Sequence, residues 1–215
     1  MWSWEFTWEI LPELVKAVQT TIWATFAGFF IALIGGLVLV CARRAKLPLL
    51  SLPAAGFIEF IRSTPLLAQL YFLFYGMPAI GISLSPFFAG VLGLGLHYST
   101  YLSEVYRSGI EAVPRGQWEA ACALNFSKAQ TWLRIILPQA IRPIVPVLGN
   151  YLIVMFKETP ILSAITLVEM LSTAKVIGSE SFRYLEAFTL VGLIFLLLSY
   201  TSSLLIGRLE EKLNQ

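Results

Sequence analysis

Few side chains in this sequence could do acid–base or metal chemistry. The one histidine is His97, and every acidic residue is a glutamate. Glu104 or Glu158 could act with His97 as the general acid and base of a membrane enzyme that works on a lipid or peptide. Neither a second metal ligand nor a nucleophile–base pair accompanies His97, so we expect no catalytic residue, no metal site and no cofactor.

A polar segment from Gly116 to Pro138 stands between two apolar blocks. Within it, Glu119 to Leu124 is strong helix-forming sequence, Asn125 can enter the left-handed region that ends a helix, and Ser127 can cap the next helix. We expect that second helix to stop near Pro138, because proline is disfavoured in a helix interior. The predicted helix-turn-helix is either an ordinary loop or a surface on which a soluble motor pushes.

The composition places the chain in a lipid bilayer. Of its 215 residues, 57% are hydrophobic and only 13% are charged, which is too apolar for a soluble domain of this size. The formal net charge is +2, and no basic cluster interleaved with aromatic residues suggests nucleic-acid binding. No linker or low-complexity stretch divides the chain, so residues 1–215 are predicted to form a single all-α membrane domain.

Apolar runs predict five membrane-spanning helices, because a span must cross ~30 Å of hydrocarbon. The loop Arg43 to Lys46 carries only positive charge, which makes it cytoplasmic and places the N-terminus outside. The central loop, about 107–140, and the C-terminal Arg208 to Lys212 are then cytoplasmic as well. The predicted spans cover about 20–40, 52–75, 86–105, 141–156 and 187–206.

Charged and proline residues interrupt or end two of these spans. Glu59 and Arg62 are three residues apart and could pair on one helix face, and Pro65 could kink the span. This pair is either a helix-start ion pair at the cytoplasmic edge or part of a transport pathway. Lys157 and Glu158 are likewise either a mutually neutralising pair or part of that pathway.

Two further segments show helical spacing without the length of a span. Trp4 to Val18 is either an amphipathic helix that lies in the membrane interface or a simple lead-in to the first span. Ser163 to Lys175 is expected to be a short amphipathic helix at the outer surface.

Fixed residues at fixed spacing connect the central polar segment with a known family. Glu119-Ala120-Ala121 is followed after three residues by Asn125, then by Ile135 and by Leu137-Pro138. This pattern resembles the coupling loop, or EAA motif, of permease subunits in ATP-binding-cassette (ABC) importers. The family usually has Gly at the position of Asn125, and both residues tolerate positive φ. The resemblance assigns ATPase coupling to Gly116, Glu119, Ala120, Ala121, Asn125, Ile135, Leu137 and Pro138.

The resemblance extends over nearly the whole chain and points to the permeases of polar-amino-acid importers. The stretches that match that family in order are Phe57–Gln69, Tyr101–Ile110, Pro138–Ile141, Leu148–Asn150 and Phe156–Thr159. Four stretches are most similar to ectoine/hydroxyectoine permeases: Leu70–Tyr75, Leu96–Tyr101, Arg115–Glu119 and Lys157–Thr166.

Membership of that family would imply a type I importer in a bacterial inner membrane. Two permease subunits, identical or homologous, would form the pathway, and two ATPase subunits would dock on the coupling loops. A periplasmic or lipid-anchored binding protein would deliver a small zwitterionic substrate. Glu119 would make polar contacts at the docking surface, where Ala120 and Ala121 are small enough to seat in a groove.

An ectoine-like substrate has a delocalised cation and a carboxylate, and the family's pathway offers groups for both. Ring faces for the cation could come from Tyr71, Tyr75, Tyr98 and Tyr101, with Glu158 as counter-charge. Hydrogen bonds to the carboxylate or the ring could come from Thr64, Gln69, His97 and Thr159. Each tyrosine could instead serve packing or interfacial anchoring. An arginine-, glutamine- or histidine-type amino acid is the alternative substrate.

Besides the enzyme considered above, a stand-alone secondary transporter driven by proton flow through glutamates remains an alternative. Five spans without a visible repeat count against it. The phosphate-binding pattern GxxxxGK[ST] does not occur, so the chain cannot be its own ATPase by that route.

Overall fold

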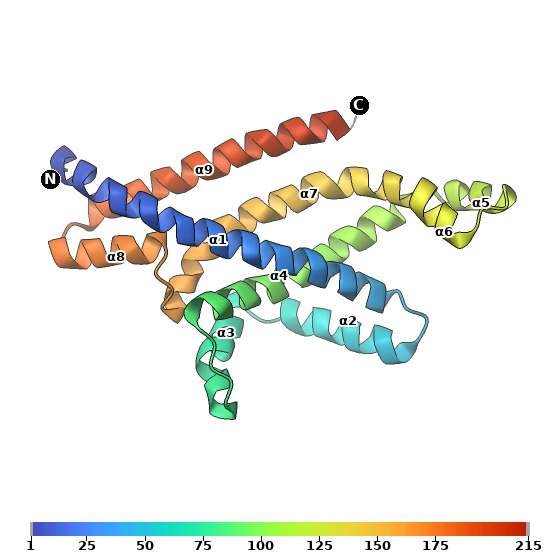
Figure 1. Ribbon diagram of the computed structural model, residues 1–215, viewed down its shortest axis with the longest axis horizontal. Helices are drawn as coiled ribbons and strands as arrows, with labels where there is room; N and C mark the ends of the chain where they lie inside the picture. The colour runs from blue at the N-terminus through green and yellow to red at the C-terminus, as the bar shows by residue number, and fades with distance from the viewer. Residues whose placement is uncertain (1, 214–215) are drawn as a thin grey trace.

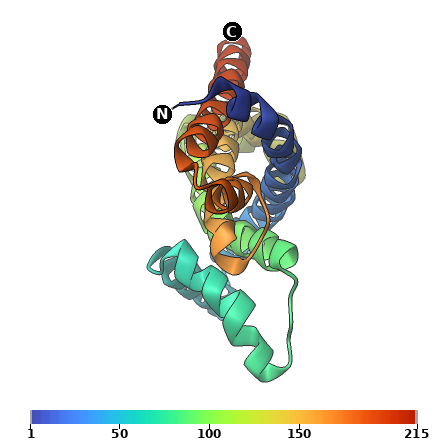
Figure 2. The ribbon, with the colours of Figure 1, turned by 90° about the vertical axis from the view of Figure 1, so that its left-hand side faces the viewer.

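The computed structural model describes residues 2–213, and within that range it consists of helices and the segments that connect them. Figures 1 and 2 show an elongated bundle, from which the segment around α3 projects to one side. The longer helices are α1 (Trp4–Arg43), α2 (Pro48–Arg62), α4 (Pro86–Glu111), α7 (Leu137–Glu158) and α9 (Tyr184–Leu213). The shorter ones are α3 (Leu66–Tyr71), α5 (Arg115–Ala123), α6 (Lys128–Gln130) and α8 (Met170–Ser181).

Helices α1 and α4 form the centre of the bundle and pack with their backbones close together. A Cβ atom added to Gly36 of α1 would lie 3.0 Å from the Cβ of Leu102, and one added to Gly95 of α4 would lie 2.5 Å from Ile31 Cγ2. Small residues allow this approach, which gains van der Waals contact where lipid offers no hydrophobic driving force. The main core continues from this pair to α7 through Leu94, Leu102 and Met155, all completely buried.

Helix α1 is continuous from Trp4 through Pro12 to Arg43, so its first turns are not a separate helix in the membrane interface. Ile10 and Leu14 are buried in a second core with Met170 of α8 and Ala187 of α9. Of the two alternatives for Trp4 to Val18, the lead-in therefore agrees with the structure. Burial against α8 and α9, rather than an interface, accounts for the apolar spacing.

The kink expected at Pro65 within the predicted span of about 52–75 is a complete break of the helix. Helix α2 ends at Arg62, Pro65 stands extended before α3 with φ −64° and ψ 139°, and α3 leaves in a different direction (Figure 1). Proline disfavours the helical conformation in the residue before it, which ends α2 here. A π-helical turn, Phe72–Gly76, and a 3₁₀ turn, Met77–Ile80, complete this arm.

The helix predicted to stop near Pro138 continues. Its α6 portion passes through a π-helical stretch, Thr131–Ile136, into α7, which starts at Leu137. The wider π-helical turn loosens the hydrogen-bond pattern just where the proline ring would otherwise clash with the preceding turn. Pro138 is therefore accommodated in the first turn of α7 and does not end the helix.

The helix expected over Ser163 to Lys175 begins and ends later in the chain than predicted. A 3₁₀ turn, Thr159–Ile165, ends at Thr166, whose φ of 66° is left-handed, and α8 begins only at Met170. Glu169 precedes α8 and accepts hydrogen bonds from the backbone N–H groups of Leu171 and Ser172 at 2.9 and 2.7 Å. This side-chain cap sets the start of α8, and the spacing of apolar residues did not predict it.

Three helical stretches in residues 2–213 are long and apolar enough to cross a membrane: Trp4–Arg43, Lys128–Ile165 and Tyr184–Leu213. They contain the predicted spans 20–40, 141–156 and 187–206. The span predicted over 86–105 lies within α4, which carries buried polar residues such as His97, Thr100 and Ser103. The count of five spans therefore stays a prediction.

Candidate substrate and coupling sites

Four aromatic side chains from two helices form a cluster next to the break between α2 and α3. His97, Tyr98 and Tyr101 come from α4, and Tyr151 comes from α7. The ring centroids of Tyr101 and Tyr151 are 6.3 Å apart, those of Tyr98 and Tyr101 5.9 Å, and those of His97 and Tyr101 5.2 Å. The spacing of one helical turn between His97 and Tyr101 places both rings on one face of α4.

Opposite charges lie at two sides of this cluster. The guanidinium carbon of Arg62, in the last turn of α2, is 5.3 Å from the centroid of the Tyr101 ring. The hydroxyl of Tyr98 donates a hydrogen bond of 2.5 Å to Glu158 Oε2 at the end of α7. Neither the predicted Glu59–Arg62 pair nor the Lys157–Glu158 pair is among the ion pairs of residues 2–213. Arg62 and Glu158 each contact a ring of the aromatic cluster instead. Of the two alternatives for Arg62, the ion pair with Glu59 does not form, and the place in a transport pathway stays a hypothesis.

Gln69 closes the helix break instead of facing the cluster with free polar atoms. Its Nε2 lies 2.8 Å from the carbonyl of Ile61, 3.1 Å from that of Thr64 and 2.8 Å from Thr64 Oγ1. Its Oε1 is 3.1 Å from His97 Nδ1 on α4. A helix end inside a membrane must satisfy its backbone carbonyls within the protein. Thr64, Gln69 and His97 thus form a structural link between the break and α4.

The remaining candidates for the substrate pathway are Thr159, Tyr71 and Tyr75, and each makes its contacts outside the cluster. Thr159 is completely buried, and its hydroxyl donates to the carbonyl of Phe156 at 2.7 Å. Tyr71 and Tyr75 contact each other, with ring centroids 5.6 Å apart, and the Tyr75 hydroxyl lies 3.3 Å from the carbonyl of Ala164. Their ring contacts do not extend to Tyr98 or Tyr101.

The turn of the predicted coupling segment has the expected conformation. Asn125 adopts a φ of 54°, and the N–H of Phe126 bonds to the carbonyl of Ala121 at 3.0 Å. Ser127 and Gln130 then form a capping box at the start of α6. The predictions for Asn125 and Ser127 are confirmed.

The candidate coupling residues differ in exposure. Gly116, Glu119, Ala120, Asn125 and Pro138 are exposed, whereas Ile135 and Leu137 are half-buried. Ala121 is completely buried within the chain, so it packs the loop internally and is not free to seat in a partner's groove.

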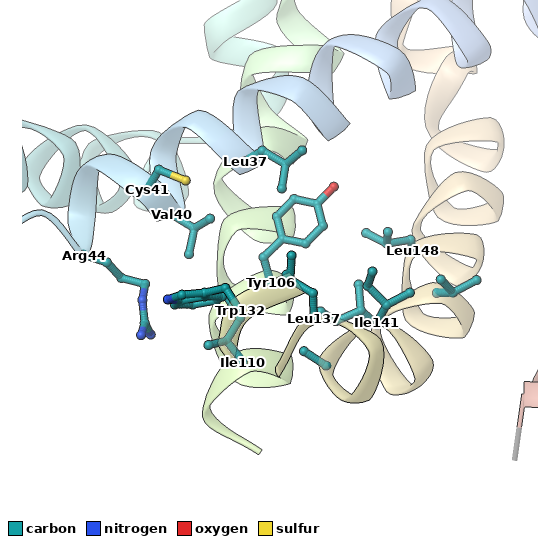
Figure 3. Close-up of a pocket in the computed structure, with 13 residues that line it drawn as sticks. Leu37, Val40, Cys41, Arg44, Tyr106, Ile110, Trp132, Leu137, Ile141 and Leu148 are labelled. Carbon is teal, nitrogen blue, oxygen red and sulfur yellow. The ribbon is translucent and has the colours of Figure 1, made fainter. Parts of the chain in front are cut away.

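Tryptophans connect α5 with the helix that leads into α7. The rings of Trp118 and Trp132 meet edge to face, with centroids 5.2 Å apart. Behind Trp132 lies an apolar groove between α1, α4 and α7, shown in Figure 3. A displacement of α5 would thus reach α7 through the π-helical stretch.

Residues 28–215 match the family described as "Binding-protein-dependent transport system inner membrane component". The chain belongs to this family. It is 48% identical over 208 residues to the probable amino-acid ABC transporter permease protein y4tG of Sinorhizobium fredii, covering 97% of this chain and 90% of the relative. It is 35% identical over 216 residues to the nopaline transport system permease protein NocM of Agrobacterium fabrum, with coverage of 96% and 90%.

Solved structures of transporters share the fold of this inner membrane component. One described as an amino acid ABC transporter with histidines superposes with a TM-score of 0.94 at 33% identity, with 99% of each chain covered. The inward-facing MetNI methionine ABC transporter gives a TM-score of 0.74 at 18% identity over 100% of each chain, which shows the fold alone. The all-α type I permease fold is thereby confirmed. The chain is a non-catalytic permease subunit, so the enzyme and stand-alone transporter hypotheses are wrong.

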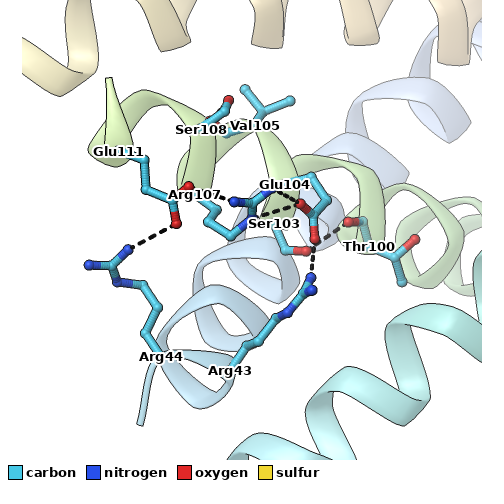
Figure 4. A network of polar contacts seen from close by, with 9 residues as sticks. All are labelled: Arg43, Arg44, Thr100, Ser103, Glu104, Val105, Arg107, Ser108 and Glu111. Carbon is cyan, nitrogen blue, oxygen red and sulfur yellow. Dashed lines mark hydrogen bonds and ion pairs between the residues drawn. The ribbon is translucent and has the colours of Figure 1, made fainter. Parts of the chain in front are cut away.

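An ion-pair network joins α1 and α4 of this transport component at the end predicted to be cytoplasmic (Figure 4). The Glu104 carboxylate pairs with Arg43 of α1 and accepts a 2.8 Å hydrogen bond from Arg107 Nε. Arg107 also donates to Glu111 at 2.6 Å, and Arg44 lies 3.7 Å from that carboxylate. Glu104 therefore fixes two helices to each other, which differs from the acid–base role considered for it from the sequence.

Proposed function

We propose that this chain is one of two permease subunits of an ATP-driven importer and that it conducts an amino acid or a related zwitterion past its aromatic cluster. The observation that carries the proposal is the placement of Arg62 and Glu158 at two sides of the tyrosine rings. A small zwitterion carries one carboxylate and one cationic nitrogen, so the cluster offers a complementary charge to each end.

The chemistry of each group suits such a solute. A guanidinium binds a carboxylate through two parallel N–H···O bonds, which fixes its orientation as well as its charge. The carboxylate of Glu158 and the rings of Tyr98 and Tyr151 attract a cationic nitrogen, whereas Arg62 already lies over the Tyr101 ring. Both attractions are stronger in a dry pathway than in water, because the local dielectric constant is lower.

An amino acid is the favoured substrate class, and ectoine is one narrower candidate within it. Relatives of this chain include a nopaline, an L-cystine and a glutamine transport permease, so the substrates of related permeases are themselves varied amino acids and their derivatives. Ectoine also has a carboxylate and a cation, so the charges around the cluster do not separate it from an amino acid. Competition for uptake between glutamine, arginine, histidine and ectoine would rank them.

The partners of this importer would follow from the exposed faces of the chain. ATPase subunits would dock on α5, where Glu119 and Ala120 are exposed and Leu124 is 68% exposed. A substrate-binding protein and the N-terminus would lie on the outer side of a bacterial inner membrane, and the C-terminus would lie in the cytoplasm. A second permease, identical or homologous, would complete the pathway.

The test uses the full transporter, reconstituted in vesicles with its ATPase and binding protein. We expect Arg62→Gln and Glu158→Gln each to lower ATP-dependent amino-acid uptake about tenfold or more, since a hydrogen bond to a charged group contributes about 1.5–3 kcal/mol. Lys157→Gln is the matched control, because Lys157 is an exposed neighbour of Glu158 and the cluster's ring and charge contacts are made by other residues. Wild-type uptake in both test variants, with the complex intact, would refute the zwitterion site.

A further inference from the structure

A groove with a volume of about 750 Å³ lies between the C-terminal part of α1, the C-terminal part of α4 and the start of α7 (Figure 3). Its walls are mostly aliphatic, with Leu37, Ile144 and Leu148 among them, and Tyr106 and Trp132 add aromatic surface. Of the described residues that line it, Arg44 is the one that carries a charge. The groove is thus an apolar slot with a single cation at one end.

Helix α9 leaves this groove open to the side. Nearer the N-terminus of α1, Thr25 and Phe26 line a smaller pocket together with Leu198 and Ile206 of α9. From Leu37 to Arg44, the groove has no lining residue from α9, and Figure 1 shows α1 and α9 diverging toward that end. Among the described residues, no part of α9 covers this end of the groove.

Positive charge surrounds the Arg44 end of the groove. Arg43, Arg44 and Lys46 follow one another at the end of α1, and the positive-inside rule places them at the cytoplasmic face. Glu104 holds Arg43, but Arg44 lies 3.7 Å from Glu111 and its side chain is 37% exposed. Arg44 therefore retains donors for an additional anion at the level of lipid headgroups.

We propose that this groove binds one anionic phospholipid of the cytoplasmic leaflet, with an acyl chain along Leu37, Ile144 and Leu148 and the phosphate at Arg44. The proposal rests on the orientation given with the proposed function. Basic pockets between membrane helices on the cytoplasmic side are suited to such headgroups, and each buried CH₂ group adds to the affinity.

The lining of the groove favours an anionic lipid over an apolar helix of a second protein. A phosphate headgroup would neutralise Arg44, the charged residue at the end of the groove, whereas an apolar helix would leave it without an added partner. Flexible acyl chains can also follow the aliphatic wall from Leu37 to Leu148. The lipid would also touch Trp132 and Leu137, which belong to the path from α5 into α7.

Cys41 lines the groove, is exposed, and can carry a fluorescent probe in a Cys122→Ser chain. The permease alone would be placed in phosphatidylcholine nanodiscs. A small fraction of the lipid would be brominated and would quench the probe, and this fraction would be either phosphatidylglycerol or phosphatidylcholine. We expect the anionic lipid to quench the probe about fivefold more effectively, the ratio that one nearby arginine provides. A probe at Phe30→Cys in a chain without Cys41 and Cys122 is the control, because Phe30 is 64% exposed on α1 away from the groove.

Two variants test the contact with the lipid headgroup and the contact with the acyl chain separately. Arg44→Gln should abolish the preference for the anionic lipid, whereas Arg115→Gln, on exposed α5, should retain it. Val145→Phe, which narrows the groove without replacing Arg44, should weaken quenching by the anionic lipid. Equal quenching by both lipids at Cys41 overturns the proposal, and quenching by neither would mean that protein covers the groove. Because the assay needs no ATPase or amino acid, its failure would leave the proposed transport function untouched.

Discussion

Helices α1 and α4 meet with their backbones close together along their contact, whereas α7 packs against the same pair in the buried core but leaves an open groove beside its first turns. On the α1–α4 side, Gly36 and Gly95 leave no room for a Cβ, and Glu104 fixes Arg43 of α1 to Arg107 of α4. On the α7 side, prolines 143 and 146 lie within the helix and a π-helical stretch precedes it. The two regions thus differ in how much movement their packing allows.

This difference suggests which part of the molecule moves when a motor acts on α5. The α1–α4 pair is close-packed at Gly36 and Gly95, and close-packed interiors do not deform gradually. The helix through Trp132 and Leu137 has a groove beside it and a loosened hydrogen-bond pattern within it. We therefore expect α1 and α4 to stay together while α7, with Glu158 at its far end, shifts against them.

The largest effect is expected from overpacking the α1–α4 contact. In Gly95→Leu, the new side chain meets Ile31, whose Cβ lies 2.6 Å from the built Cβ position, and the carbonyl of Gly28. Overpacking costs about 1–3 kcal/mol and more where backbone blocks relief, so unfolding in detergent should occur at a clearly lower temperature. Gly192→Leu on α9 is the matched control, since a Cβ there meets nothing within 4 Å. Equal unfolding temperatures for the two variants would contradict the rigid pair.

Removing the ion-pair centre should have the next largest effect. Glu104→Ala leaves Arg43 and Arg107 without their shared carboxylate, and we expect a loss of about 2 kcal/mol in the free energy of unfolding. Glu111→Ala should cost less than about 1 kcal/mol, because that side chain is 51% exposed. A double-mutant cycle between Arg43→Ala and Glu104→Ala measures the coupling; a coupling energy near zero would show that the pair does not hold the helices together.

Reversing the charge of Glu119 on α5 should weaken binding of the ATPase subunit without changing the stability of the permease. Glu119 is exposed on α5, so Glu119→Arg should unfold like the wild type. Its capture of the ATPase subunit from the same source should fall about tenfold, because a repelled or unpaired charge at an interface weakens binding by kilocalories. Gln117→Arg, an exposed neighbour, controls for added charge. Undiminished capture by the Glu119 variant would remove this residue from the docking surface.

The smallest effect concerns the pH dependence of stability at Glu169, which lies outside the predicted spans. Burial raises the pKa of this completely buried carboxyl, although two backbone N–H groups and Lys175 oppose the shift. Because the folded-state pKa is above the unfolded one, the folded state binds the proton more tightly. The associated stability is present at low pH and is lost as the pH rises through the raised pKa.

Glu169→Gln should remove that loss, since an amide does not titrate. The unfolding temperatures of variant and wild type, measured from about pH 4 to about pH 7, should diverge in favour of the variant as the pH rises. Glu180→Gln, on the exposed surface of α8, is the control. A constant difference across the range would show that burial does not govern this carboxyl.

Local sequence signals were sufficient for several features of this protein. The excess of apolar residues determined a membrane protein, because so many cannot be buried within 215 residues in water. The turn at Asn125 and the cap at Ser127 depend on residues within one helical turn, so their predictions were confirmed. The spaced coupling motif likewise indicated the transport family that the whole chain matches.

Only the tertiary structure decided which side chains share a site. Arg62 reaches Tyr101 because α2 breaks beside α4, and Gln69 serves the break because the chain brings its amide to the carbonyls of Ile61 and Thr64 at the end of α2. Ala121 is buried by neighbours that its motif does not specify. These outcomes depend on distances between helices far apart in the chain, whereas composition, spacing and capping act within a few residues. That is why the sequence determined the membrane class, the turn at Asn125 and the cap at Ser127, and packing determined the site.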